Sequence, residues 1–170
     1  ATKYLHLNLT DNVASASTVH NNTEPTSSVF SIGTNSHVNT ASGTYLAYCF
    51  AEKQGYSKFS TYTGNGSTDG TFVYCGFKPA FVLVKRLSGT TQGWYMWDNR
   101  SDGFNPRNFN LEANDSVAID DGNQRIDLLS NGFKWRVSDT IVNNSGTEYL
   151  FIAFAESPFV NSNGVPNNAE

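Results

Sequence analysis

The sequence has few charged residues. Only 15% are Asp, Glu, Lys or Arg, and the 15 acidic residues outnumber the 11 basic ones, for a net charge of −4. A nucleic-acid-binding surface needs clustered positive charge, and an acidic chain without a basic run does not provide it. A run of about 18 consecutive apolar residues, which a membrane-spanning helix needs, is also missing. We therefore expect neither a nucleic-acid partner nor membrane insertion.

Residues with reactive side chains are scarce too. The two cysteines, Cys49 and Cys75, are too few for the disulfide framework of a small secreted domain. They form one disulfide if their strands are neighbours, and otherwise they are two free thiols. The histidines, His6, His20 and His37, form no HxH or HxxxH pair, and no nucleophile elbow or phosphate-binding loop occurs. The sequence predicts no catalytic residue, no metal site and no cofactor.

What the chain does have is β-strand sequence separated by turns rich in Gly, Asn, Ser and Thr. About ten short segments alternate apolar and polar residues or form short apolar runs, and helical periodicity is absent. The segments are YLHLNL from Tyr4, SVFSI from Ser28, TYLAYCF from Thr44, YSKFSTY from Tyr56, TFVYC from Thr71, AFVLVKRL from Ala80, GWYMW from Gly93, RIDLL from Arg125, FKWRV from Phe133 and EYLFIAF from Glu148. This pattern predicts an all-β fold, an antiparallel β-sandwich of about ten strands that resembles a jelly roll. We expect its core to include Phe81, Leu83, Tyr149, Phe151 and Phe154.

Two segments of the chain are similar to each other. TYLAYCFAE from Thr44 to Glu52 matches EYLFIAFAE from Glu148 to Glu156 at its second and third residues and at its FAE ending, and a Ser-Gly-Thr turn precedes each. The similarity predicts a repeating module, with residues 1–54 as the C-terminal part of one repeat and residues 55–170 as the next complete one. The alternative is that both segments are core strands with similar requirements.

Three sequence segments together carry a family resemblance. They are GYSKFSTYTGNGSTDGTFVYCGFKPAFVLVKR, LLSNGFKWR and the FAESPF ending. It resembles an uncharacterised domain that recurs, often in tandem, near the C-termini of tail or fibre proteins of marine bacteriophages, frequently behind a laminin-G or concanavalin-like domain. Related domains more often carry Thr where this chain has Cys75, which disfavours a Cys49–Cys75 bridge. The resemblance implies a virion or extracellular location and no known chemistry.

The best candidate for a recognition site is the aromatic segment GWYMWDNR. Its alternation puts Trp94 and Met96 on one face of a strand and Tyr95 and Trp97 on the other. One face belongs to the core, and the other offers a platform on which a sugar ring could stack. The predicted ligand-binding residues are Tyr95, Trp97, Asp98, Asn99 and Arg100. The alternative is that both faces pack against sheets or subunits.

These observations favour a structural and adhesive module of a phage virion appendage, such as a tail fibre, that does not catalyse a reaction. Its expected partners are other copies of itself, other virion proteins and a glycan of the host surface. A homo-oligomer is expected because residues 1–54 are predicted to be an incomplete repeat, whose apolar strands must be covered by the next repeat or by neighbouring subunits. The resemblance to viral fibres implies a trimer. The alternatives are a capsid decoration protein, a carbohydrate-binding adhesin of a bacterial surface and a capsule-degrading glycosidase with two facing carboxylates.

Overall fold

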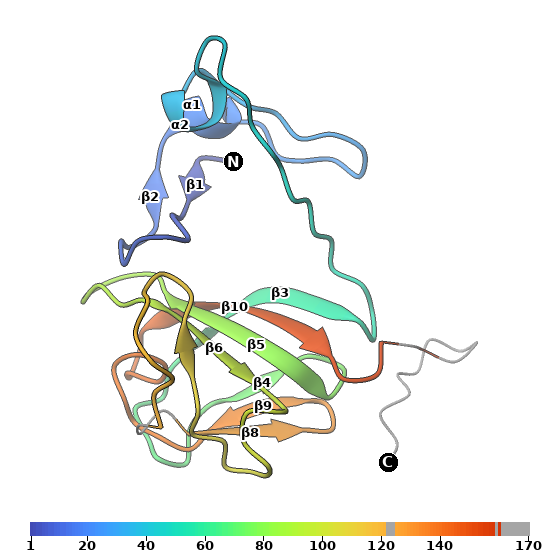
Figure 1. Ribbon diagram of the computed structural model, residues 1–170, viewed down its shortest axis with the longest axis vertical. Coiled ribbons are helices and arrows are strands. Elements are labelled where there is room, and N and C mark those ends of the chain that lie inside the picture. The colour runs from blue at the N-terminus through green and yellow to red at the C-terminus, as the bar shows by residue number, and fades with distance from the viewer. Residues whose placement is uncertain (122–124, 159, 161–170) are drawn as a thin grey trace.

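The computed structural model of the chain describes residues 1–121, 125–158 and 160. It has two visibly different parts (Figure 1). Residues 1–50, termed the N-terminal arm, contain little regular structure and lie above one sheet of a β-sandwich that is formed by the described residues between 51 and 158. Residues 161–170, which the predicted second repeat includes, lie outside the described part of the chain.

Nearly all of the regular structure consists of β-strands. The strands are β1 (Lys3–Tyr4), β2 (Ala14–Ser15), β3 (Ser57–Thr63), β4 (Phe72–Tyr74), β5 (Pro79–Arg86), β6 (Trp94–Asp98), β7 (Leu111–Glu112), β8 (Ile126–Leu129), β9 (Gly132–Trp135) and β10 (Glu148–Ala155). The two helices, α1 (Ser17–His20) and α2 (Ser36–Asn39), have four residues each. In the described residues no helix is long and apolar enough to cross a membrane.

The larger sheet is antiparallel and has the order β3-β10-β5-β6-β7. Strand β10 pairs with β3 on one edge, where Tyr149 lies opposite Tyr62, and with β5 on the other, where Tyr149 lies opposite Arg86. The sequence of β10, EYLFIAFA, is apolar on both faces, as a central strand requires.

The smaller sheet has the order β4-β9-β8 and is also antiparallel. Its middle strand begins at Gly132, which lies opposite Tyr74 of β4. A Cβ atom at Gly132 would lie 2.1 Å from the carbonyl oxygen of Val73, so the close approach of the two backbones requires glycine.

The core lies between the two sheets and is mostly aromatic. Trp97 of the larger sheet packs edge-on against Trp135 of the smaller one, with 5.1 Å between ring centroids. Phe133 makes a similar contact with Phe151 at 5.5 Å, and Tyr62 stacks on Tyr149 at 5.1 Å. The predicted all-β antiparallel sandwich is therefore confirmed, and so is the burial of Tyr149 and Phe151.

The prediction that Phe81, Leu83 and Phe154 belong to this core was wrong. All three side chains are only half-buried, because they point to the outer face of the larger sheet while Val82, Val84 and Ala153 point inward. Strands β5 and β10 are apolar on both faces, so their sequence alone does not tell which face is the core.

Three strands predicted in the N-terminal arm do not form as expected. Only Lys3–Tyr4 is a strand at the start of the predicted segment 4–9, and residues 28–32 and 44–50 belong to no strand that the structure describes. Residues 44–50 descend from the arm to β3 as an extended segment (Figure 1). Strand-like sequence becomes a strand only where a neighbouring backbone completes the ladder.

Replacing Phe133 with alanine should destabilise the sandwich, because the ring is fully buried. The expected loss in the free energy of unfolding is about 3–5 kcal/mol, measured by urea denaturation. The matched control is Phe104→Ala, because this ring is 80% exposed; its effect should stay within about 0.5 kcal/mol. Similar losses for both variants would contradict the packing of Phe133 between the sheets.

Candidate functional site

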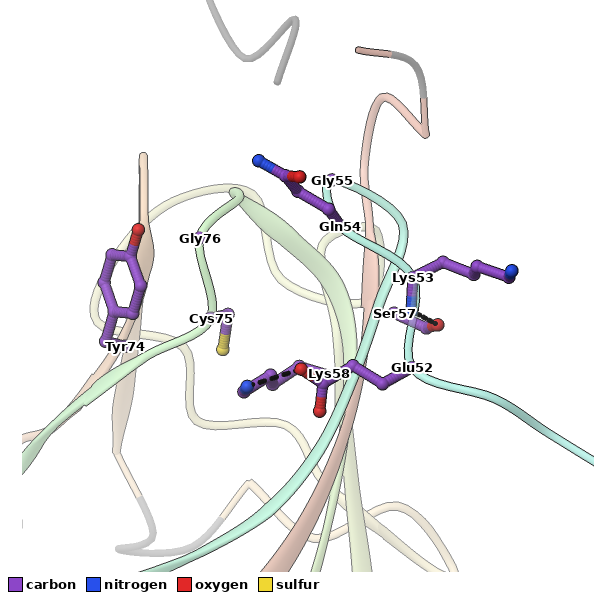
Figure 2. Close-up of a pocket in the computed structure, with 9 residues that line it drawn as sticks. All are labelled: Glu52, Lys53, Gln54, Gly55, Ser57, Lys58, Tyr74, Cys75 and Gly76. Carbon is purple, nitrogen blue, oxygen red and sulfur yellow. Dashed lines mark hydrogen bonds and ion pairs between the residues drawn. The ribbon is translucent and has the colours of Figure 1, made fainter. Parts of the chain in front are cut away.

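One side of the sandwich carries a cleft of about 410 Å³ between two turns (Figure 2). The residues that line it are Glu52, Lys53, Gln54, Gly55, Ser57, Lys58, Tyr74, Cys75 and Gly76. The first turn leads into β3 and the second comes after β4, so the two walls come from different sheets. Both turns contain a glycine with positive φ, Gly55 at 70° and Gly76 at 80°.

Ser57 fixes the first wall of this cleft. Its side chain is buried, donates to the carbonyl of Ala51 at 2.9 Å and accepts from the backbone N–H of Lys53 at 3.2 Å. The turn is thereby held against the start of β3. Lys58 and Glu52, which lie on the same side of the cleft as Ser57, form an ion pair at 2.6 Å (Figure 2).

The thiol of Cys75 lies in the cleft but is expected to be unreactive. Burial raises the pKa of this thiol to about 12, although the charge of Lys58 acts in the opposite direction. The thiol is therefore protonated at neutral pH and is a poor nucleophile. The ring of Tyr74 is largely exposed at the rim. An exposed aromatic ring beside hydroxyl, amide and charged groups can hold a polar ligand by contact and hydrogen bonding.

The predicted ligand-binding aromatics do not lie at a surface. Trp97 is 1% exposed and Tyr95 is 8% exposed, and both rings point into the core between the sheets. Burial, followed by the nearby carboxylate of Glu112, raises the pKa of Tyr95 to about 12. Neither ring has a free face on which a sugar could stack. The two rings instead pack between the sheets, as the alternative interpretation of this segment had it.

The polar residues of the same prediction stabilise the turn that comes after β6. Burial acts to raise the pKa of Asp98, but hydrogen bonds from Ser101 and from the backbone N–H of Arg100 outweigh it and leave the pKa lowered. Asn99 donates to the carboxylate of Glu156 at 2.6 Å. Arg100 is exposed. The five predicted residues are thus divided between the core and one turn and do not form a single site.

The outer face of β5 and β6 supports the N-terminal arm. The indole Nε1 of Trp94 donates to the carbonyl of His6 at 2.8 Å, and Lys85 Nζ donates to the carbonyls of Thr10 and Gln92 at 3.0 and 2.6 Å. Lys85 is completely buried, and this desolvation lowers its pKa.

An apolar groove of about 320 Å³ lies between the arm and the outer face of the larger sheet. The residues that line the groove are Leu5, Leu7 and Phe50 of the arm and Phe59, Phe81, Leu83, Trp94, Ile152 and Phe154 of the sheet. The side chains predicted to be core are therefore covered in part by the arm. Sequence reasoning missed both this groove and the cleft, since each joins segments that are distant in the chain.

The part of the chain that the structure describes contains no group of three His, Cys, Asp or Glu residues that could hold a metal ion. The rings of His6 and His37, which are far apart in sequence, lie 5.5 Å apart. A carboxylate oxygen of Asp11 lies 3.6 Å from Nδ1 of His6.

A family model described as a domain of unknown function (DUF7483) matches residues 1–158. The match covers the N-terminal arm and the sandwich together. No curated protein and no solved structure matches the chain significantly.

The two thiols should differ sharply in reactivity. Cys49 is exposed and Cys75 is buried, and neither is in a disulfide. We expect native protein at pH 8 to show one fast-reacting thiol with a disulfide reagent, and denatured protein to show two. The variant Cys49→Ser should lose the fast phase, and Cys75→Ser should keep it. Two fast thiols in the native chain would contradict the burial of Cys75.

Proposed function

The chain belongs to the DUF7483 family, a domain of unknown function, and we propose that it is a structural and adhesive module that works by contact in an extracellular assembly. The finer proposal is a virion appendage such as a phage tail fibre, and the sequence resemblance to tail and fibre domains supports it. The proposed partners are neighbouring copies in a homo-oligomer, other proteins of the particle and a glycan on the host surface.

The observation that carries this proposal is an exposed apolar row in residues 44–50. The exposed fractions are 49% for Tyr45, 77% for Leu46, 78% for Tyr48 and 68% for Phe50. Contiguous apolar surface of this kind marks an interaction site on a soluble protein. The extended backbone of the segment also has hydrogen-bonding groups that a partner strand can use.

The adhesive part of the proposal concerns the cleft beside Tyr74. Its exposed ring, the Lys58–Glu52 ion pair and the polar turn residues suit a polar ligand such as a glycan. The protonated thiol of Cys75 favours binding over nucleophilic chemistry at this position. Repeated copies in an assembly would multiply weak contacts of this kind into useful avidity.

Association of the chain tests the proposal. Sedimentation velocity at increasing micromolar concentrations should show reversible oligomers, because the apolar row gains cover on contact. The double variant Leu46→Glu/Tyr48→Glu should shift the association to at least about tenfold higher concentration, since each charge must be desolvated in the contact. The control is Val117→Glu, an exposed apolar position outside this segment, which should associate like the parent. A chain that stays monomeric throughout would contradict the proposed self-assembly.

A further inference from the structure

The turn that precedes residues 44–50 has the same hydrogen bonds as the turn that precedes β10. In the arm, the Asn35 side chain accepts from the backbone N–H of His37 at 2.9 Å, and the Asn39 side chain donates to the carbonyl of Gly33 at 2.8 Å. The backbone N–H of Asn39 donates to the carbonyl of Asn35 at 2.9 Å.

Each of these bonds recurs 104 positions later in the chain. The Asp139 side chain accepts from the backbone N–H of Ile141 at 2.6 Å, and the Asn143 side chain donates to the carbonyl of Val137 at 2.8 Å. The backbone N–H of Asn143 donates to the carbonyl of Asp139 at 2.8 Å.

A tyrosine closes both turns in the same way. Tyr45 accepts from the backbone N–H of Thr40 at 2.7 Å and donates to the carbonyl of Ser36 at 3.0 Å.

Its counterpart Tyr149 accepts from the backbone N–H of Asn144 at 3.0 Å and donates to the carbonyl of Thr140 at 2.9 Å. These partners are again 104 positions apart. Residues 33–45 and 137–149 therefore share these five hydrogen bonds, although residues 36–39 form α2 and residues 140–142 form a turn. A chance similarity between two core strands does not explain the shared bonds.

The segments on the C-terminal side of the two turns differ in their pairing. Strand β10 is paired along both edges, from Glu148 to Phe154 with β3 and from Tyr149 to Ala155 with β5. The corresponding segment 44–50 is extended but lies outside every strand described, and its side chains are exposed.

We propose that residues 44–50 are the central strand of a second sandwich of the same kind, and that the partner that completes it is a module segment supplying strands equivalent to β3 and β5. This inference rests on the proposed function, because it names the partner of the same exposed row. In the repeat of 104 positions, residues 1–52 correspond to residues 105–156, so the strands that would complete their unit correspond to residues 53–104, which contain β3 to β6.

A second folded copy of this chain can cover the apolar row by side-chain contact, but it cannot pair with residues 44–50 in the manner of β10. In each copy the facing edges of β3 and β5 are already occupied by β10 over its whole length. The partner must therefore be a module segment whose β3-like and β5-like strands have no β10 of their own.

The register of the match identifies a residue that reports on the pairing. Cys49 corresponds to Ala153, which is completely buried and lies opposite Val82 of β5. Cys49 is exposed in this chain. Pairing of residues 44–50 in the manner of β10 would bury its thiol against the valine that corresponds to Val82.

The test is a fusion that places a copy of residues 53–104 directly in front of Ala1 of the whole chain. Alkylation of Cys49 by iodoacetamide, followed by peptide mass spectrometry, should be at least about tenfold slower than in the unfused chain, because a paired central strand opens rarely. Backbone amides of residues 45–50 should gain protection from hydrogen exchange, while those of β10 stay protected and show that the resident sandwich is intact.

The matched control carries Val82→Asp and Val84→Asp in the added copy only. These valines lie opposite Ala153 and Phe151 in the resident sheet, so the control should leave Cys49 as reactive as in the unfused chain. Unchanged Cys49 reactivity in the unmodified fusion would overturn the inference, even if the unfused chain forms reversible oligomers. If Cys49 is alkylated slowly in the fusion and the unfused chain stays monomeric, the inference is supported. Only the self-association of "Proposed function" is then contradicted.

Discussion

Strand β10 is bonded to β3 along one edge and to β5 along the other, and its inward side chains face the smaller sheet. The other strands of the larger sheet are placed by this one, since β6 pairs with β5 and β7 with β6. Tyr149 is the first inward side chain of β10, and it stacks on Tyr62 while its hydroxyl is bonded to the backbone of the preceding turn. A single side chain thus fixes both where β10 begins and which of its faces is the core.

A buried amide joins this turn to the other side of the sandwich. Asn143 is completely buried, and its side-chain nitrogen donates to Asn65, Ser67 and Val137, while its oxygen accepts from the N–H of Asn65. A buried amide with several partners stabilises one arrangement of the chain strongly, because any shift leaves polar groups unpaired. The loop between β3 and β4 is therefore held against the entrance to β10, although the two segments are far apart in sequence.

Local sequence pattern predicted the strands of the sandwich well and their environment poorly. Short runs of branched and aromatic residues located β3, β5, β6 and β10, because pleated sheets favour such residues. It did not distinguish the faces of β6, where Trp94 and Trp97 are both large and apolar and yet only Trp97 lies between the sheets. It also predicted a strand over residues 44–50, where the intrinsic preference is present and the partner backbone is not. The cleft at Tyr74 lies between two turns that the two sheets bring together, so the local sequence of either turn does not predict it.

The N-terminal arm has almost no regular structure, yet polar contacts to the sandwich hold it in place. The ammonium of Lys85 donates to the carbonyl of Thr10, and the indole of Trp94 donates to the carbonyl of His6, so detaching the arm from the sandwich would break both hydrogen bonds. Residues 44–50 run from this anchored arm to the start of β3, and both ends of the segment are therefore fixed. Holding a segment extended before it meets a partner reduces the conformational entropy lost on pairing. The same contacts that keep the arm on the sandwich thus prepare its unpaired strand for a partner.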